Sequence, residues 1–139
     1  MSKREKVCPV VLRVSKEVLE VLAFIHPSAG KQFVKGTIEN GETPRQAAER
    51  ELREESGLVV QSPMIFLGVQ EIGNDRVPWH FFSHYSAPAL DAWIHVTEDD
   101  HGHSFTFFWH PIGQPLDQDW HPIFHEAFEF FVPRIPFLG

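Results

Sequence analysis

The sequence predicts an α/β sandwich, in which helices cover both faces of a β-sheet. Segments with strand character flank one strongly bounded helix at 44–56, and a second helix is expected at 120–131. The aromatic run from Phe105 to Trp109 carries large apolar side chains on both of its alternating faces, as expected of a strand that is covered on both sides. Strands mixed with two helices in this way imply the sandwich.

The composition is that of a globular chain. Its 139 residues suit one domain, 1–139, and thirteen Phe and four Trp provide ample apolar surface for a core. No apolar run approaches the roughly 18 residues that span a bilayer, and no signal-peptide pattern is present, so we expect a cytoplasmic protein without membrane contact. The single cysteine, Cys8, cannot form an internal disulfide, which agrees with a reducing compartment.

The charge balance excludes one class of partner. The net charge is −7, and the Lys and Arg residues are dispersed along the chain. A polymeric nucleic acid would therefore be repelled at long range. A small anionic ligand remains compatible if a metal ion supplies positive charge locally, and the sequence leaves a homodimer open.

The N-terminal part reads as strands. Strands are expected at 10–14 and 17–26, around a turn near Ser15, because the second run is rich in β-branched and apolar residues. The segment 27–30 reads as a loop, and 32–36 as a short strand.

The helix at 44–56 has signals at both ends. Thr43 can act as the N-cap, Pro44 occupies the first helical position, and Gln46 completes a capping box. Gly57 supplies a left-handed C-terminal stop. Together these residues predict the helix and its bounds.

The remaining elements are predicted less sharply. The terminal helix at 120–131 is expected to end before Pro133. Most of the large aromatic residues are expected in the core and not stacked on a base. Strands are expected at 59–61, 65–72, 80–86, 93–96 and 104–110.

Three glutamates gather on one side of the predicted helix. At about 100° of rotation per residue, Glu51, Glu54 and Glu55 share an arc of about 100°, which we call the acidic arc. Ala48 and Leu52 form the neighbouring apolar stripe, which is expected to pack on the sheet. The acidic arc therefore borders the buried face.

The acidic arc predicts a site for a divalent cation. Two carboxylates about 6 Å apart repel each other by roughly 3 kcal/mol at an effective dielectric constant near 20. A cluster of hard oxygen ligands suits Mg²⁺ or Mn²⁺, which also take water and phosphate oxygens. The alternative is a solvated acidic face whose charges are neutralised by Arg50 and Arg53.

The surrounding sequence favours the metal site. The chain reads GTIENGE at 36–42 and RELREESGL at 50–58. These residues fill all nine specified positions of the Nudix box, G-x5-E-x7-R-E-U-x-E-E-x-G-U with U aliphatic, within 23 residues. In this segment, about a sixth of its length, the chain resembles the Nudix hydrolase family.

The resemblance implies a fold, a cofactor and a reaction. The fold would be an α/β/α sandwich with a mixed sheet, and the cofactor Mg²⁺ or Mn²⁺. Glu51 and Glu54 would be catalytic, one of them deprotonating water, and Arg50 would orient Glu51. Glu42 would brace the junction between loop and helix. The implied metal ligands are the Gly36 carbonyl, Glu51, Glu54 and Glu55. The implied reaction is attack of metal-activated water on one phosphorus of a small-molecule diphosphate.

Outside the box the pattern offers three further candidates. Glu98 and Asp100, with His103 just behind them, stand where many Nudix enzymes recruit an additional acid or base. The alternative is a solvated turn before the next strand. Nine histidines could otherwise suggest zinc, for example at His80 and His84, but no pair recurs with Cys at a familiar zinc spacing.

The substrate is limited only by elimination. Position 72 is Ile where ADP-ribose hydrolases of the family carry Pro, and the dinucleoside-polyphosphate Tyr and the NADH-hydrolase signature are also missing. A nucleoside diphosphate derivative, a nucleoside triphosphate or another small organic diphosphate is left. Two alternatives are a non-catalytic Nudix domain that binds a nucleotide or protein, which need not keep the glutamates, and an isomerase, for which Cys8 lies far upstream.

Overall fold

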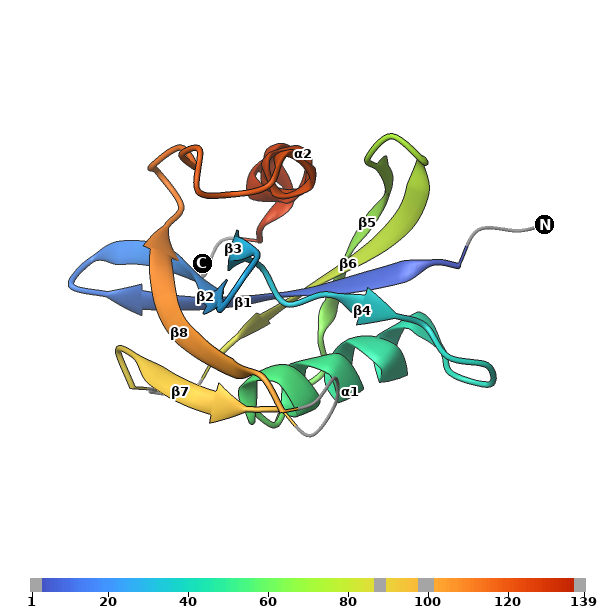
Figure 1. Ribbon diagram of the computed structural model, residues 1–139, viewed down its shortest axis with the longest axis horizontal. Helices are drawn as coiled ribbons and strands as arrows, with labels where there is room; N and C mark the ends of the chain where they lie inside the picture. The colour runs from blue at the N-terminus through green and yellow to red at the C-terminus, as the bar shows by residue number, and fades with distance from the viewer. Residues whose placement is uncertain (1–3, 87–89, 98–101, 137–139) are drawn as a thin grey trace.

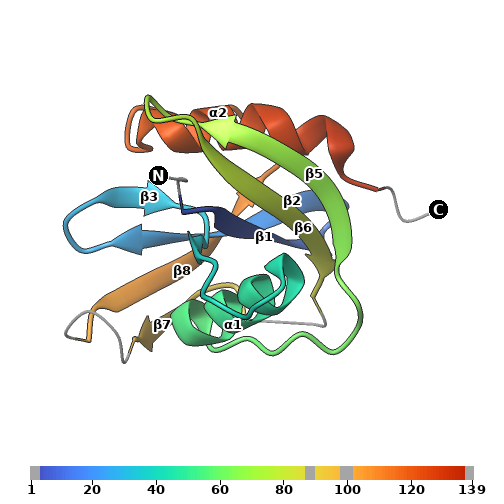
Figure 2. The same ribbon diagram turned by 90° about the vertical axis from the view of Figure 1, so that its right-hand side faces the viewer.

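The structure is a computed structural model that describes residues 4–86, 90–97 and 102–136. Helices α1 (Pro44–Ser56) and α2 (Pro122–Phe131) lie on opposite faces of the sheet, as Figures 1 and 2 show, which confirms the predicted sandwich. None of the described helices is long and apolar enough to cross a bilayer. The strands are β1 (Lys6–Ser15), β2 (Val18–His26), β3 (Gly30–Gln32), β4 (Gly36–Thr37), β5 (Ile65–Ile72), β6 (Val77–Tyr85), β7 (Trp93–Val96) and β8 (Ser104–Pro111). A 3-10 turn, η1 (Val132–Arg134), follows α2.

The sheet is mixed, as the resemblance implies. Within the described residues its strands run in the order β5-β6-β1-β2-β8-β7, with β3 added to β2 and β4 added to β1. β1 and β6 pair in parallel, whereas the other pairs are antiparallel. The chain between β3 and β4 crosses from β2 to β1, which carries Gly36 to a position opposite Val7.

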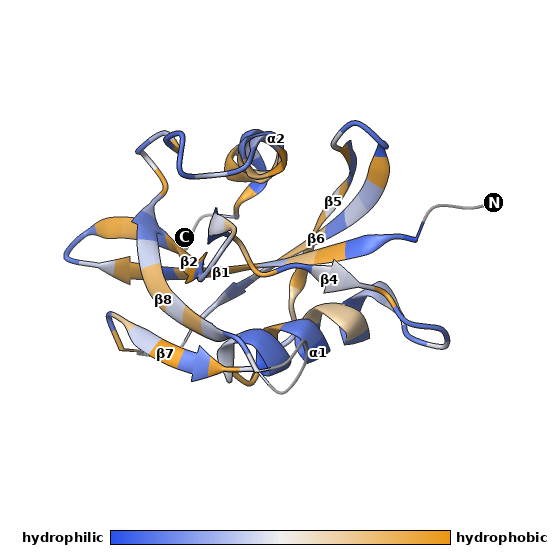
Figure 3. Ribbon diagram, viewed as in Figure 1, coloured by the Kyte–Doolittle hydropathy of each residue, from blue (hydrophilic) through white to orange (hydrophobic). Residues whose placement is uncertain are grey.

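Two apolar layers hold the helices to the sheet. On one side, Phe124 and Phe131 of α2 pack with Phe33 and Trp79. On the other side, α1 contributes only two alanines and one leucine, Ala47, Ala48 and Leu52, to a second layer. Figure 3 shows the difference, since the C-terminal half of α1 is hydrophilic while much of the sheet is hydrophobic.

The predicted caps of α1 are confirmed. The hydroxyl of Thr43 accepts a hydrogen bond from Gln46 N at 3.2 Å, and the Gln46 side chain accepts one from Thr43 N at 2.9 Å. Pro44 begins the helix, and Gly57 ends it with a φ of 82°. The observed bounds, Pro44–Ser56, are those that these four residues predict.

One predicted strand is wrong. Residues 59–61 form no strand, although two valines favour one. Val59 is 65% exposed, and the segment runs past the end of α1 without a neighbouring strand to pair with. Pro63, two residues beyond this segment, lacks an N–H and disfavours an extension toward β5.

Other differences concern element bounds. The single strand expected at 32–36 is two short strands, β3 and β4, because the chain changes its partner from β2 to β1 between them. β1 and β6 begin earlier than predicted, at Lys6 and Val77. α2 begins at Pro122, two residues late, because His121 Nδ1 accepts a hydrogen bond from Ile123 N at 3.1 Å and caps the helix there.

Candidate metal centre and active site

The site begins where β4 meets α1. A Cβ atom added to Gly36 would collide with the carboxylate of Glu51, so the β4 backbone and this carboxylate are in direct contact. Only glycine permits so close an approach. The fold thus brings together the first and the fourth specified residues of the motif, which are fifteen positions apart in the chain.

Arg50 connects the carboxylates of the motif. Its Nε and Nη2 donate to the two oxygens of Glu42 at 2.6 and 2.9 Å, a bidentate pair. Its Nη1 donates to Glu51 at 2.8 Å and to Glu54 at 3.1 Å, while Nη2 also reaches the carbonyl of Thr37 at 3.0 Å. One guanidinium therefore fixes the loop before α1 and two glutamates of the acidic arc.

The pKa values around Arg50 follow from these contacts. Its hydrogen bonds hold the pKa of Glu42 below the usual range, and Glu42 in turn raises the pKa of Arg50. Glu42 also accepts a hydrogen bond from Glu39 N at 3.0 Å. Glu42 is thus an ionised brace between the loop and the helix.

Glu55 is the member of the acidic arc whose charged form is least favourable. Burial raises its pKa well above the ordinary value, and the charge of Glu51 and a hydrogen bond to that carboxyl raise it further. The nearby Lys35 offsets part of this shift. Glu55 Oε2 is buried and has no hydrogen-bond partner among the described residues. Such an orphaned oxygen is costly unless a ligand satisfies it.

This arrangement fits a divalent cation. The unpartnered oxygen of Glu55 lies beside Glu51, and hard oxygen ligands of this kind suit Mg²⁺ or Mn²⁺. Glu54 instead faces Arg50. In the ranges 4–86, 90–97 and 102–136, no three His, Cys, Asp or Glu side chains already converge as a metal site. A bound cation would therefore have to draw Glu54 toward the other two.

Two side chains that the sequence did not reveal fasten the end of α1. Trp93 Nε1 donates to the carbonyl of Ser56 at 3.0 Å, and His95 Nε2 lies 3.0 Å from the carbonyl of Glu54. Both come from β7 and meet carbonyl groups of the last helical turn, which lack partners inside the helix. No local pattern in the sequence predicts this docking, because it depends on which strand becomes the sheet edge.

Of the three candidates outside the motif, only His103 is described. Its ring lies 5.1 Å from that of His26 and 6.4 Å from that of Phe105, measured between centroids. Glu98 and Asp100 lie outside the described residues. The zinc alternative, which the sequence already disfavours, finds no support at His80 and His84, because the two rings have different partners: His80 Nε2 is 2.8 Å from Glu5, and His84 Nδ1 is 3.4 Å from the hydroxyl of Ser62.

Two further features lie apart from the acidic arc. A cavity of about 840 Å³ borders the other edge of α1, where Leu52, Ser56, His84 and Trp93 line it, and no glutamate of the arc does. Cys8 is buried in the sheet, and burial raises the pKa of its thiol. A buried, protonated thiol is a poor nucleophile, which disfavours the isomerase alternative.

Known proteins resemble this chain in sequence or in fold. The RNA pyrophosphohydrolase of Hydrogenovibrio crunogenus is 27% identical over a match of 115 residues, and the match covers 69% of this chain and 69% of that one. The NUDIX domain of Shewanella oneidensis NrtR, solved with ADP ribose, superposes with a TM-score of 0.71 at 14% identity, over 96% of this chain and 89% of that one.

A second solved structure points the same way. A MutT structure from a study of Aliivibrio salmonicida and Vibrio cholerae superposes with a TM-score of 0.67 at 16% identity, over 97% of this chain and all of that one. At such identities these two structures speak for the fold alone. The NUDIX domain model, in contrast, matches the sequence itself over residues 3–130. The chain therefore belongs to the NUDIX domain family.

Proposed function

We propose that this protein is a Mg²⁺- or Mn²⁺-dependent hydrolase that cleaves the diphosphate linkage of a nucleoside diphosphate derivative or another small organic diphosphate. The observation that carries the proposal is the buried, unpartnered oxygen of Glu55 beside Glu51, at the contact with Gly36. A protein that used this helix only for packing would gain stability by losing that oxygen.

The residues of the site have distinct tasks in this proposal. Glu51, Glu54 and Glu55, with the carbonyl of Gly36, would hold the metal ion. When bound, the ion would lower the pKa of a water molecule and offset the charge of the phosphates. Arg50 holds Glu51 and Glu54 in place through its Nη1, and Glu42 holds Arg50. Arg50 and Glu42 thus act through the glutamates and not on the substrate.

The reaction is a hydrolysis. The water oxygen forms a bond to one phosphorus, the bond from that phosphorus to the bridging oxygen breaks, and two phosphate-bearing products leave. The proton lost by the water passes to a carboxylate of the acidic arc. Glu51 and Glu54 are the two candidates, and they differ in access: the Glu54 side chain is 36% exposed and that of Glu51 is 15% exposed. A pH profile of kcat for each Gln variant assigns the base.

Small molecules suit the site better than RNA does, although a relative is named RNA pyrophosphohydrolase. The chain has a net charge of −7, which disfavours a long phosphate backbone. The NrtR domain with ADP ribose shows that a protein of this fold can take a small diphosphate ester. We therefore expect turnover of small nucleotides and not of RNA ends.

A substrate screen tests the proposal. The protein is incubated with Mg²⁺ or Mn²⁺ and a panel of nucleoside di- and triphosphates, ADP-ribose and a 5′-triphosphorylated oligonucleotide, and phosphate and monophosphate are measured. Metal-dependent release from a small nucleotide supports the proposal. Release from the oligonucleotide alone would replace the substrate class. If no compound is hydrolysed while one binds in calorimetry, the alternative of a non-catalytic nucleotide-binding domain replaces the enzyme.

A further inference from the structure

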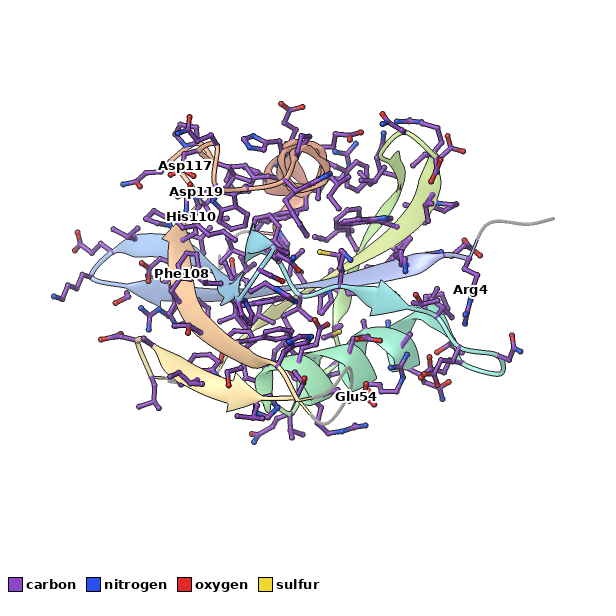
Figure 4. All side chains as sticks on the ribbon, in the orientation of Figure 1. Arg4, Glu54, Phe108, His110, Asp117 and Asp119 are labelled. Atoms are coloured by element: carbon purple, nitrogen blue, oxygen red, sulfur yellow. The ribbon has the colours of Figure 1, made fainter. Side chains whose placement is uncertain are left out.

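The cavity beside the C-terminal end of α1 does not belong to the acidic arc. Its volume of about 840 Å³ falls in the range of roughly 300–1,000 Å³ that is typical of small-molecule sites. α1 contributes Leu52 and Ser56 to its wall. At about 100° of rotation per residue, both lie about 160° around the helix from Glu54, which Figure 4 labels on α1. The cavity therefore lies on the side of α1 that faces away from Glu54.

The wall of the cavity carries no formal charge. The described residues that line it include no Asp, Glu, Lys or Arg, although these four types make up 22% of the whole chain. A phosphate or carboxylate that entered the cavity would lose hydration without meeting an opposite charge, which is costly. The ligand that suits this cavity is therefore uncharged, unlike the phosphate-bearing substrate proposed for the acidic arc.

The inner wall of the cavity is apolar and partly flat. Val11 and Leu52 line it, and each is 1% exposed. Trp93 also lines it and lies almost parallel to Phe107, with an interplanar angle of 8° and 5.1 Å between the ring centroids. This stacking holds the ring of Trp93 in one orientation. A fixed aromatic wall suits a ligand with a planar ring.

Two apolar side chains of the cavity are in contact with solvent. Val59, in the chain that follows α1, and Leu90, shortly before β7, line the cavity, although they are 65% and 70% exposed. A ligand that covers them removes apolar surface from water, which favours binding. The exposed part of the cavity thus also favours an apolar ligand.

The hydrogen-bonding groups of the wall are unequally occupied. The side chains of Ser56, Tyr85 and Trp93 each donate to a backbone carbonyl. The ring of His84, in contrast, has one long hydrogen-bond contact among the described residues, 3.4 Å from its Nδ1 to the hydroxyl of Ser62. Capacity for a ligand is therefore concentrated at one place in the cavity, at His84 and Ser62.

The ring of His84 is neutral at pH 7.5. Burial lowers the pKa of His84 below its ordinary value, and the charge of Glu49 offsets only part of this shift. A neutral imidazole has one donor and one acceptor nitrogen. With the neighbouring hydroxyl of Ser62, it can accept a hydrogen bond from an N–H or O–H group of an uncharged molecule.

We propose that this cavity binds a small, uncharged aromatic molecule that carries one N–H or O–H group. Its ring would lie against Leu52 and Trp93, and its polar group would point toward His84 and Ser62. This ligand is neither the substrate nor the metal ion, so the inference goes beyond the proposed hydrolase and does not depend on it. The protein then has two sites on one helix, one for charged ligands and one for a neutral ligand.

The first test compares three probes of nearly equal shape at pH 7.5. Indole is neutral and has an N–H, 1-methylindole is neutral without one, and indole-2-carboxylate is charged. Each is titrated into the protein by calorimetry. We expect indole to bind, 1-methylindole to bind about threefold to tenfold more weakly, and the carboxylate at least about tenfold more weakly.

The second test assigns the polar contact. His84→Phe keeps a ring but removes both nitrogens, so indole should bind to this variant only as strongly as 1-methylindole does, while the affinity for 1-methylindole stays within about twofold. A merely structural role of His84 would weaken both probes alike. This difference between the probes holds even if the variant is less stable.

The third test concerns the exposed apolar side chains. The double variant Val59→Ser with Leu90→Ser should weaken indole and 1-methylindole alike, by about fivefold. The matched control is Val18→Ser, at a residue that is 43% exposed on β2 and does not line the cavity, and it should bind both probes like the wild type.

The last test locates the bound probe. Amide resonances of Ser56 and His84 should shift on addition of indole, whereas those around Phe124, on the other face of the sheet, should not. Glu55→Gln should bind indole within about twofold of the wild type, because Glu55 does not line the cavity. No binding of indole by the wild type, equal affinity for the carboxylate, or shifts confined to the α2 side would overturn the inference.

Discussion

The two helices cover the same sheet in opposite ways. α2 places Phe124 and Phe131 into an aromatic layer with Phe33 and Trp79, all of them buried. α1 packs with two alanines and a leucine, and sets carboxylates next to them. Both helices have an N-cap, a proline in the first turn and a buried stripe.

This difference in packing suggests a division of tasks, with stability on the α2 side and chemistry on the α1 side. A buried phenylalanine contributes to stability about in proportion to the apolar area that it removes from water. The orphaned oxygen of Glu55 does the opposite, because its burial costs free energy and no hydrogen bond among the described residues offsets that cost. The α2 side is therefore expected to carry more of the fold's stability, and the α1 side the function. Each prediction below tests one half of this division.

The largest expected effect is on turnover, at Glu54. Glu54→Gln keeps the shape of the side chain but removes a charge that the proposed metal site needs, so kcat should fall at least about 100-fold. The free energy of unfolding should change by less than about 1 kcal/mol, because the ion pair with Arg50 is partly exposed and one repelling charge is lost. Phosphate release and a urea titration measure the two quantities.

Glu49→Gln is the matched control for this change. Glu49 belongs to the same helix but lies outside the acidic arc, so its loss should leave kcat within about twofold of the wild type. Equal loss of turnover in both variants would mean that the overall charge of α1 matters and not the acidic arc.

The next effect is on stability, at Phe124. Phe124→Ala removes a fully buried ring that lies 6.0 Å from Phe33 and 6.1 Å from Trp79, between centroids. The expected loss is about 3–5 kcal/mol, measured by urea unfolding. The kcat per folded molecule should stay within about twofold.

Phe66→Ala serves as the control on the outside of the molecule. Phe66 is 54% exposed on β5, and its loss should cost about 1 kcal/mol or less. If Phe124→Ala lowered kcat as strongly as Glu54→Gln does, the division between the two sides would be wrong.

The sequence predicts α1 far better than it predicts the surroundings of α1. The helix bounds follow from Thr43, Pro44, Gln46 and Gly57, which act within a few residues of each other. The residues that we propose to hold the metal come from a dense local motif. Pairing partners, in contrast, depend on distant chain: β1 pairs in parallel with β6, about 70 residues away, and no local pattern specifies that.

The same limit explains what was missed in the site. The contacts of Trp93 and His95 with the end of α1 exist only once the strand order is known. The strand predicted at 59–61 is absent because its formation also depends on distant chain. Its valines favour an extended chain, but a strand also needs a neighbour to pair with.

A smaller effect is expected from the metal itself. Mg²⁺ should stabilise the protein by RT ln(1 + [Mg²⁺]/Kd), about 2.7 kcal/mol at 100 times Kd. Glu55→Gln should lose most of this gain, because the amide cannot take a negative charge. Thermal midpoints with and without Mg²⁺ measure it, and calorimetry in buffers of different ionisation enthalpy should detect a proton released from the wild-type site.

Glu39→Gln is a suitable control for the metal effect. Glu39 lies in the loop before α1, mostly exposed, 3.7 Å from Arg50, and should leave the Mg²⁺ gain unchanged. Stabilisation of Glu55→Gln by Mg²⁺ to the wild-type extent would remove Glu55 from the ligand set.

The smallest effect is the pH dependence of the metal-free protein, and it has opposite signs at two glutamates. The folded state raises the pKa of Glu55 above its ordinary 4.5, so the stability from this group is present below pH 4.5 and is lost as pH rises through the raised value. The folded state lowers the pKa of Glu42, so its contribution is present above 4.5 and is lost as pH falls through the lowered value.

Urea unfolding from about pH 3 to pH 8 measures both contributions. Stability should decline above pH 4.5 because of Glu55, and Glu55→Gln should abolish this decline. Stability should also decline below pH 4.5 because of Glu42, and Glu42→Gln should abolish that one. Phe124→Ala should lower the whole curve without changing its shape, because the α2 side near Phe124 stabilises by packing and not by charge. A Glu55→Gln curve that keeps the decline above 4.5 would assign that strain to another group and would weaken the contrast between the two helices.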